Sequence, residues 1–224
     1  MREAGGREGR GLFVTFEGGE GVGKSTQVAR LAERLRRTRG SEVVVTREPG
    51  GTPRAERIRA ALLGGGAKAH GPLAEAVLFA AARLDHLDAL IRPALARGAI
   101  VLCDRFSDST RAYQGAAGGV EPRLLDAIER AVVGATRPDL TLVLDLPPAV
   151  GLARAEARAG ARDRFEAESA AFHERLSQAF RALAASDPGR CRLIDAGRTQ
   201  DAVEAEIWAA VVPRLHEVIR DDAA

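Results

Sequence analysis

The sequence has no long apolar run. Hydrophobic residues make up 46% of its 224 residues, yet no stretch approaches the ~20 apolar residues that a membrane helix needs. Residues 1–10 contain basic side chains with no apolar stretch behind them, which argues against a secretory signal. We therefore expect no membrane partner, and we interpret residues 1–10 as a disordered tail.

Cysteine and lysine are both scarce. Cys103 and Cys191 are too few for a disulfide framework and lie in apolar, strand-like stretches. We expect them to be reduced core thiols of a cytoplasmic protein. Lys24 and Lys68 are the two lysines, and all other members of the basic set are arginines. A lysine at a chemically critical place is therefore informative.

The charge pattern excludes one class of partner. The formal net charge is only +2, and acidic and basic residues are interleaved along the chain. Proteins that bind nucleic acid usually gather basic residues into a patch or stripe. We expect no nucleic-acid partner.

Short apolar or β-branched runs alternate with longer amphipathic segments. The candidate strands are Leu12–Glu17, Glu42–Thr46, Ile100–Asp104, Leu140–Leu146 and Arg192–Asp195. Helical patterns lie at about 24–38, 54–63, 73–97, 121–133, 149–160, 168–185 and 199–219. This alternation predicts an α/β fold, with a five-stranded parallel sheet and helices on both faces.

No linker divides the chain, so we expect residues 11–224 to form a single domain. Pro93 should kink or divide the helical segment that contains it. The Gly- and Ala-rich stretches at 64–71 and 115–119 are interpreted as loops. In open α/β sheets, ligands bind beyond the carboxyl ends of the strands, so the residues after each strand are the candidates for chemistry.

A glycine-rich motif follows the first predicted strand directly. Residues 18–25, GGEGVGKS, fit the phosphate-loop pattern G-x-x-x-x-G-K-[ST] between a strand and a helix. In such a loop backbone N–H groups point at phosphate oxygens, Lys24 can reach the β- and γ-phosphates, and Ser25 is a ligand for Mg²⁺. The alternative is a glycine-rich turn without a ligand. The ATP-binding candidates are Gly18, Gly19, Glu20, Gly21, Val22, Gly23, Lys24, Ser25 and Thr26.

A phosphate loop alone does not name a reaction. The N-K-x-D motif of guanine-specific proteins is absent, which argues against a GTPase. The third predicted strand ends in Asp104 and Arg105, beside the loop. Asp104 is a natural outer ligand for Mg²⁺, and Arg105 can clamp a phosphate with two N–H groups. A salt bridge from Arg105 to a neighbouring helix is the alternative.

Four further segments point to one family. They are TREPGGT at 46–52, LFAAAR at 78–83, the stretch from Asp104 that ends in AYQG at 112–115, and DRFE at 163–166. With the phosphate loop, their order and spacing resemble the thymidylate kinases from about residue 11 to the C-terminus. The resemblance implies a P-loop kinase fold with a lid at about 153–166. It also implies transfer of phosphate from Mg-ATP to dTMP in dTTP synthesis, and a homodimer.

The resemblance also implies residue roles in the pocket. Phe79 would stack on the thymine ring, although its helical spacing by itself favours a core residue. Arg83 would donate to a thymine carbonyl, and Arg47 and Arg105 would clamp the dTMP phosphate. Tyr113, the only tyrosine, would lie against the 2′ face of the sugar. The substrate-binding residues so implied are Glu20, Arg47, Glu48, Phe79, Arg83, Arg105, Ser109, Thr110, Tyr113 and Gln114.

Family members differ in whether the catalytic arginine lies in the phosphate loop or in the lid. This loop has Glu20 and no arginine, so we expect the lid to supply the cation. The lid contains Arg154, Arg158, Arg162 and Arg164. A solvated helix face is the alternative for this charge run. The catalytic candidates are Lys24, Arg105, Arg158, Arg162 and Arg164, with Ser25 and Asp104 as the metal ligands.

Two other functions remain open from the sequence. One is a related small-molecule kinase that acts on cytidylate or on a deoxynucleoside. The other is a nucleotide-dependent switch or regulatory ATPase, which would hydrolyse ATP slowly without an acceptor. Comparing acceptors in a phosphorylation assay separates all three.

Overall fold

The computed structural model describes residues 11–39, 42–157 and 164–222. Its centre is a parallel sheet with strand order β2-β3-β1-β4-β5. The strands are β1 (Phe13–Glu17), β2 (Val43–Arg47), β3 (Ile100–Asp104), β4 (Leu140–Asp145) and β5 (Cys191–Asp195). The predicted α/β fold with a five-stranded parallel sheet is confirmed, and each predicted strand is present to within a residue or two.

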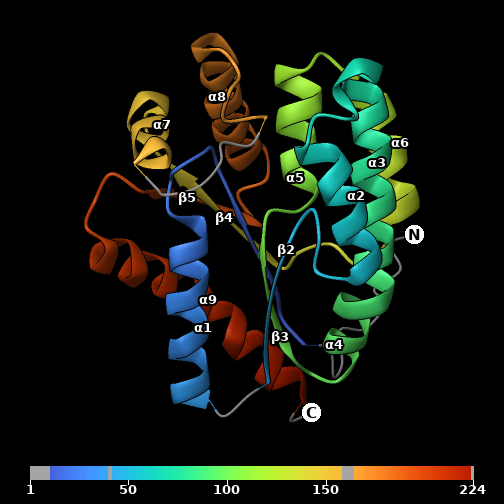
Figure 1. The fold of residues 1–224 in the computed structure, drawn as a ribbon. Coiled ribbons are helices and arrows are strands. Elements are labelled where there is room, and N and C mark those ends of the chain that lie inside the picture. The colour runs from blue at the N-terminus through green and yellow to red at the C-terminus, as the bar shows by residue number, and fades with distance from the viewer. Residues whose placement is uncertain (1–10, 40–41, 158–163, 223–224) are drawn as a thin grey trace.

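Helices cover both faces of the sheet (Figure 1). The α-helices are α1 (Lys24–Arg39), α2 (Pro53–Leu63), α3 (Gly71–His86), α4 (Arg92–Ala96), α5 (Ser107–Thr110), α6 (Pro122–Val132), α7 (Pro148–Glu156), α8 (Ala170–Ser186) and α9 (Gln200–Asp222). A 3₁₀ turn, η1 (Lys68–His70), and two π-helical segments, η2 (Leu87–Ile91) and η3 (Arg111–Ala117), lie between them. Within the described residues, no helix is long and apolar enough to cross a membrane.

Strand β1 is the centre of the core because helices pack against both of its faces. Its side chains alternate: Val14 and Phe16 pack in the cluster that contains α1 and α9, whereas Phe13 packs against η2 and α4. All five residues of β1 are buried. A strand buried on both faces reads as a continuous apolar run, which is why the sequence identified it. Its carboxyl end therefore opens in the middle of the sheet, where the phosphate loop begins.

Pro93 changes the helix type without ending the helix. The chain stays helical from Gly71 to Ala96, and the π-helical turn η2 ends at Ile91, with only Arg92 between it and Pro93. Proline lacks an N–H and its ring crowds the carbonyl four residues earlier, and a wider turn relieves both problems. The predicted disturbance is present in this form.

The expectation of a loop at 115–119 is wrong for its first three residues. Helix α5 continues as η3 through Ala117. Gly115 is buried in this helix, where an added Cβ would lie 2.9 Å from Cδ1 of Leu125 on α6 and would push that side chain aside. The stretch 64–71 is also partly helical, since it contains η1 and the first residue of α3.

Candidate active site

The phosphate loop lies between β1 and α1 in a form that only glycine permits. Gly18 has φ +131°, and a Cβ there would lie 2.3 Å from the carbonyl oxygen of Leu144 on β4. Gly21 has φ +66°, and its Cβ would lie 1.8 Å from the carbonyl oxygen of Gly151 on α7. The loop is therefore packed tightly against two neighbouring elements. This packing fixes the direction of its backbone N–H groups.

Lys24, the first residue of α1, folds back across this loop. Its Nζ donates to the carbonyl oxygens of Gly18 at 3.1 Å and Gly19 at 2.7 Å. Burial, followed by the nearby charge of Arg105, lowers the pKa of Lys24 to about 8. An anion in the loop would favour the charged form of this amine. Lys24 is thus held where a bound phosphate would meet it.

Ser25 and Asp104 meet beside the loop. The Ser25 hydroxyl donates to Oδ2 of Asp104 at 2.6 Å, which joins the start of α1 to the end of β3. In the described part of the chain, no group of three or more His, Cys, Asp or Glu side chains could hold a metal ion alone. Mg²⁺ usually takes one or two protein oxygens and completes its shell with water and phosphate oxygens. These two hard oxygen ligands therefore fit Mg²⁺ bound together with a nucleotide.

Arg105 follows β3 in a strained backbone conformation, with φ +70°. Its Nη1 donates to the carbonyl oxygen of Gly18 at 2.9 Å and to Oγ of Ser109 at 3.3 Å. Its Nη2 donates to Oε1 of Glu20 at 2.8 Å, and the Tyr113 hydroxyl donates to the same oxygen. The guanidinium also lies 5.0 Å from the centre of the Tyr113 ring. Strain of this kind persists where surrounding contacts hold it, often at functional sites.

The acidic residue in the phosphate loop is held in its charged form. Burial alone would raise the pKa of Glu20, but Arg105, Lys24 and the hydroxyl of Tyr113 lower it to about 2. Burial likewise opposes the charge of Arg105, but Glu20 and Tyr113 raise its pKa above the usual value. Glu20 therefore compensates the cations of the loop.

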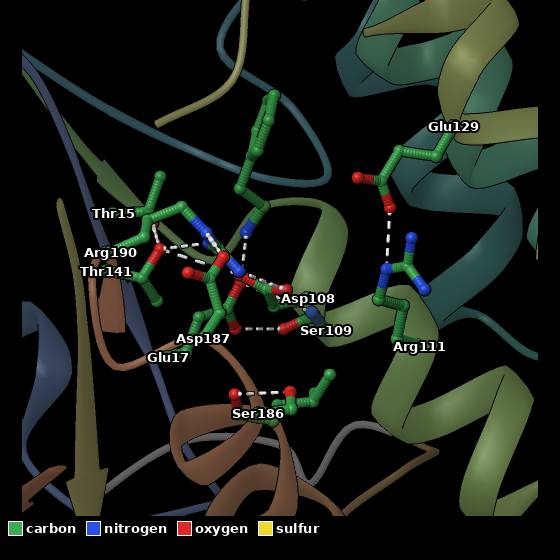
Figure 2. A network of polar contacts seen from close by, with 12 residues as sticks. Thr15, Glu17, Asp108, Ser109, Arg111, Glu129, Thr141, Ser186, Asp187 and Arg190 are labelled. Carbon is green, nitrogen blue, oxygen red and sulfur yellow. Dashed lines mark hydrogen bonds and ion pairs between the residues drawn. The ribbon is translucent and has the colours of Figure 1, made fainter. Parts of the chain in front are cut away.

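A second carboxylate, Glu17, holds the chain that follows Arg105 (Figure 2). Its Oε1 accepts from the backbone N–H groups of Phe106 at 2.8 Å and Ser109 at 3.2 Å. Its Oε2 accepts from the Ser109 hydroxyl at 2.6 Å. Burial, followed by the charge of Asp108, raises the pKa of Glu17 to about 7. Glu17 thus satisfies the backbone at the start of α5, a role that the sequence analysis missed.

Arg190, directly before β5, supports α5 from the other side (Figure 2). It donates to both oxygens of Asp108, at 2.6 and 3.2 Å, and to Oγ1 of Thr141 at 2.6 Å. Thr141 lies 2.8 Å from Thr15 on β1, between their hydroxyl oxygens. A charge at the end of a fully buried strand could have revealed Glu17. The role of Arg190 at α5 gives no local signal, because Asp108 is 82 residues away in the sequence.

A pocket of about 270 Å³ extends from the phosphate loop toward α3 and η3. At this far end Arg83 is buried, with 3% of its surface exposed. Its Nε donates to Oε2 of Glu48 at 2.7 Å, and its Nη2 donates to the Phe106 carbonyl and to Oγ1 of Thr110, both at 3.1 Å. His86 contacts the other oxygen of Glu48 at 3.1 Å. The guanidinium is therefore fixed by three acceptors, one after β2 and two on α5 and its N-cap.

Gln114 and Glu75 form a second contact behind this end of the pocket. Nε2 of Gln114 donates to Oε2 of Glu75 at 3.3 Å. Arg164 of the lid donates to Oε1 of Glu75, and its guanidinium lies 4.2 Å from the centre of the Phe165 ring. Glu75 is 3% exposed and was not predicted from the sequence.

The structure brings most of the predicted site residues to one pocket wall. The predicted residues that line it are Glu20, Gly21, Val22, Gly23, Lys24, Ser25, Thr26, Arg47, Glu48, Phe79, Arg83, Asp104, Arg105, Ser109, Thr110, Tyr113 and Gln114. Gly18 and Gly19 do not line the pocket, but their carbonyl oxygens accept hydrogen bonds from Lys24. Arg47 also pairs with Glu56 at 2.8 Å, at an exposed position. The half-buried ring of Phe79 faces the pocket 6.3 Å from that of Phe165.

The predicted lid is described in part. Arg158 and Arg162 lie outside the described residues, so their catalytic role stays a prediction. Arg154 donates to the carbonyl oxygen of Ala196 at 3.3 Å, and Arg164 pairs with Glu75. Phe165 and Glu166 are the described lid residues that line the pocket.

Comparison with known proteins gives a consistent result. Residues 16–207 match the family model described as thymidylate kinase. The chain is 58% identical over 207 residues to the thymidylate kinase of Nitrobacter winogradskyi, covering 92% of this chain and 90% of that protein. It is 56% identical over 206 residues to the thymidylate kinase of Caulobacter vibrioides, covering 92% and 98%.

A solved structure agrees with this match. The crystal structure of thymidylate kinase from Ehrlichia chaffeensis superposes with a TM-score of 0.72 at 34% sequence identity, over 90% of this chain and 98% of that one. The geometry of the site agrees with these matches. The chain has a phosphate loop, an Asp–Arg pair at the end of β3, and a pocket that reaches the buried guanidinium of Arg83. The chain belongs to the thymidylate kinase family.

Proposed function

We propose that this protein phosphorylates dTMP to dTDP with ATP as the donor and Mg²⁺ bound with the nucleotide, in the synthesis of dTTP. The single observation that carries the proposal is the shape of the pocket. It is continuous from the phosphate loop, past Arg105, to the buried guanidinium of Arg83. A nucleoside monophosphate bound there would have its phosphate near Arg105 and its base near Arg83.

The chemistry requires alignment and charge neutralisation more than proton transfer. The attacking oxygen belongs to a phosphate that is already ionised at neutral pH, so no strong general base is needed. Mg²⁺, held through Ser25 and Asp104, would supply charge neutralisation at the β- and γ-phosphates of ATP. Lys24 would contact the same phosphates from the loop, and Arg105 would hold the acceptor phosphate in line.

The lid would complete the set of cations. We propose that at least one of Arg158, Arg162 and Arg164 contacts the transferring group. The absence of arginine from residues 18–25 supports this proposal. A closed lid would also exclude water and so limit wasteful hydrolysis of ATP.

The remaining pocket residues would select the acceptor. Phe79 would stack on the base, Arg83 would donate to a base carbonyl, and Tyr113 would pack against the 2′ face of the sugar. The hydrogen bond from Tyr113 to Glu20 supports this arrangement, because it fixes the ring at the pocket wall. Ribose would place a hydroxyl against that ring, which favours deoxyribonucleotides.

An ADP-release assay with a panel of acceptors tests the proposal. We expect rapid ADP release with dTMP, slower release with dUMP, and little with dCMP, dGMP, thymidine or no acceptor. The Lys24→Ala variant should lose turnover with every acceptor by orders of magnitude while it remains folded. A preference for dCMP would indicate a cytidylate kinase. Slow hydrolysis that no acceptor stimulates would indicate a nucleotide switch.

We also propose that the protein is a cytoplasmic homodimer. Leu73, Val77 and Leu84 on α3 and Leu124 on α6 are exposed large hydrophobic residues, and such residues mark association surfaces when they lie together. Cys103 and Cys191 are both buried and free, which suits a reducing compartment. Size-exclusion chromatography with light scattering should give twice the mass of the chain, 23.7 kDa.

A further inference from the structure

The orientation of the Gln114 side-chain amide decides whether the pocket wall presents a hydrogen-bond donor or an acceptor to a base. Gln114 lies on η3 and is 2% exposed, yet it lines the pocket. One helical turn earlier, Thr110 accepts a hydrogen bond from Arg83. Arg83 and Gln114 therefore act on the same end of the pocket. Arg83 can only donate, whereas an amide can donate with its NH₂ or accept with its carbonyl oxygen.

Glu75 removes this ambiguity. Its carboxylate accepts hydrogen bonds and does not donate them, so the NH₂ of Gln114 must face Oε2 of Glu75 at 3.3 Å. The reversed amide would place two oxygen acceptors face to face at this distance, in a buried place where unpaired polar atoms are costly. With the NH₂ turned toward Glu75, the carbonyl oxygen of Gln114 is left for the pocket.

Arg164 keeps Glu75 in this position. It donates to Oε1, so the carboxylate has a cation on one oxygen and the amide of Gln114 on the other. The side chains of Glu75 and Arg164 are 4% and 13% exposed. A buried, paired carboxylate has little freedom to rotate, and its two oxygens have separate partners.

We propose that Glu75 is a specificity-determining positioning residue, which fixes the Gln114 amide so that the pocket presents a donor from Arg83 beside an acceptor from Gln114. This pair matches a base edge with a carbonyl oxygen next to a ring N–H, as in thymine and uracil. Cytosine has an amino group and an unprotonated ring nitrogen at these places, so it meets a donor with a donor and an acceptor with an acceptor. The inference rests on the proposed function.

The Glu75→Gln variant tests the proposal. Arg164 would draw the carbonyl oxygen of the amide introduced at position 75, so the NH₂ of that amide would face Gln114. Gln114 would then turn its own carbonyl oxygen toward position 75 and its NH₂ toward the pocket. We expect kcat/KM for dTMP to fall about tenfold or more while kcat/KM for dCMP holds or rises. The measured quantity is the ratio of the two values.

Two further variants separate specificity from general damage. Arg164→Met removes the cation that pairs with Glu75 but leaves the carboxylate, so the dTMP-to-dCMP ratio should fall less than in Glu75→Gln. The double variant Glu75→Gln with Gln114→Glu places a carboxylate at position 114, which can only accept. The ratio should then recover toward the wild-type value. Thermal melting curves identify any variant that fails to fold.

The outcomes for this inference and for the proposed function are distinct. A wild-type protein that does not phosphorylate dTMP overturns the proposed function. A wild-type protein that does, together with a folded Glu75→Gln variant that keeps its dTMP-to-dCMP ratio, overturns the role of Glu75 alone. A ratio that collapses equally in Arg164→Met would also contradict the proposal, because that variant retains the carboxylate.

Discussion

The two ends of the pocket are constructed in different ways. The phosphate end is mainly backbone from one contiguous segment, Gly18–Gly23, completed by Lys24 and by Asp104 and Arg105 at the end of the neighbouring strand. The base end is made of side chains from separate helices and loops, and those side chains are held by other side chains behind them. Phosphates are common to all nucleotides, whereas a base must be distinguished from other bases.

Because of this difference, we expect substitutions at the two ends of the pocket to change different kinetic constants. Groups at the phosphate end would act on charge that develops during transfer, so their loss should lower kcat. Groups at the base end would bind the acceptor similarly before and during transfer, so their loss should raise KM or change the choice of acceptor. A variant at the phosphate end that changes only KM, or a variant at the base end that changes only kcat, would contradict this division.

The largest effect is expected at Arg105. Arg105→Ala removes the guanidinium that bonds Gly18 and Glu20, and we expect turnover with dTMP to fall about 10²–10³-fold. Arg111→Ala is the matched control, because Arg111 begins η3, after α5, and pairs on α6 with Glu129 (Figure 2) and with Asp126. Steady-state kinetics of both variants test the prediction. Near-normal turnover by a folded Arg105→Ala protein would contradict the assignment of the site.

A smaller effect of a different kind is expected at Phe79. Phe79→Ala should raise KM for dTMP by about 5–150-fold, which corresponds to the ~1–3 kcal/mol of a base–aromatic stack. KM for ATP serves as the internal control and should hardly change. If Phe79 is instead a core residue, the variant would lose about 3–5 kcal/mol of stability and both substrates would be affected alike. Its half-buried ring at the pocket wall favours the first outcome.

The same contrast explains what the sequence could predict. The phosphate end was recognisable because its residues are contiguous: the loop requires glycines with positive φ at fixed spacing, and Asp104 and Arg105 close a buried apolar strand. The inner strands β1, β3 and β4 were identified because helices bury both of their faces and leave mainly apolar runs. Local rules of this kind can be read from the sequence.

The base end depends on long-range contacts that no local pattern carries. Gln114 was predicted from the family resemblance, but its partner Glu75 lies 39 residues away on another helix. The helical segment η3 was missed in part because Gly115 resembles a loop residue, although it is buried in a helix beside Leu125 of α6. Arg190 and Asp108 are likewise ordinary charged residues until the fold brings them together.

The last effect concerns stability rather than catalysis, at the carboxylate behind the phosphate end. The pKa of Glu17 is raised from 4.5 to about 7 by burial and by Asp108, so the folded state binds its proton more tightly than the unfolded state does. The stability that this provides is fully present below pH 4.5, and it is lost as the pH rises through 7. Its size is on the order of 3 kcal/mol, since one pKa unit corresponds to about 1.4 kcal/mol.

Glu17→Gln removes this titration, so its free energy of unfolding should depend less on pH between about 5 and 8 than that of the wild type. Denaturant unfolding at several pH values measures the difference. Glu42→Gln is the control at an exposed position. The hydrogen bond from Arg97 lowers the pKa of Glu42 below its usual value, so Glu42 stays ionised throughout this range and its replacement should shift stability by the same amount at each pH. Equal pH slopes for wild type and Glu17→Gln would show that Glu17 is already ionised at the acidic end of this range, because the contacts from Ser109 and Phe106 outweigh its burial.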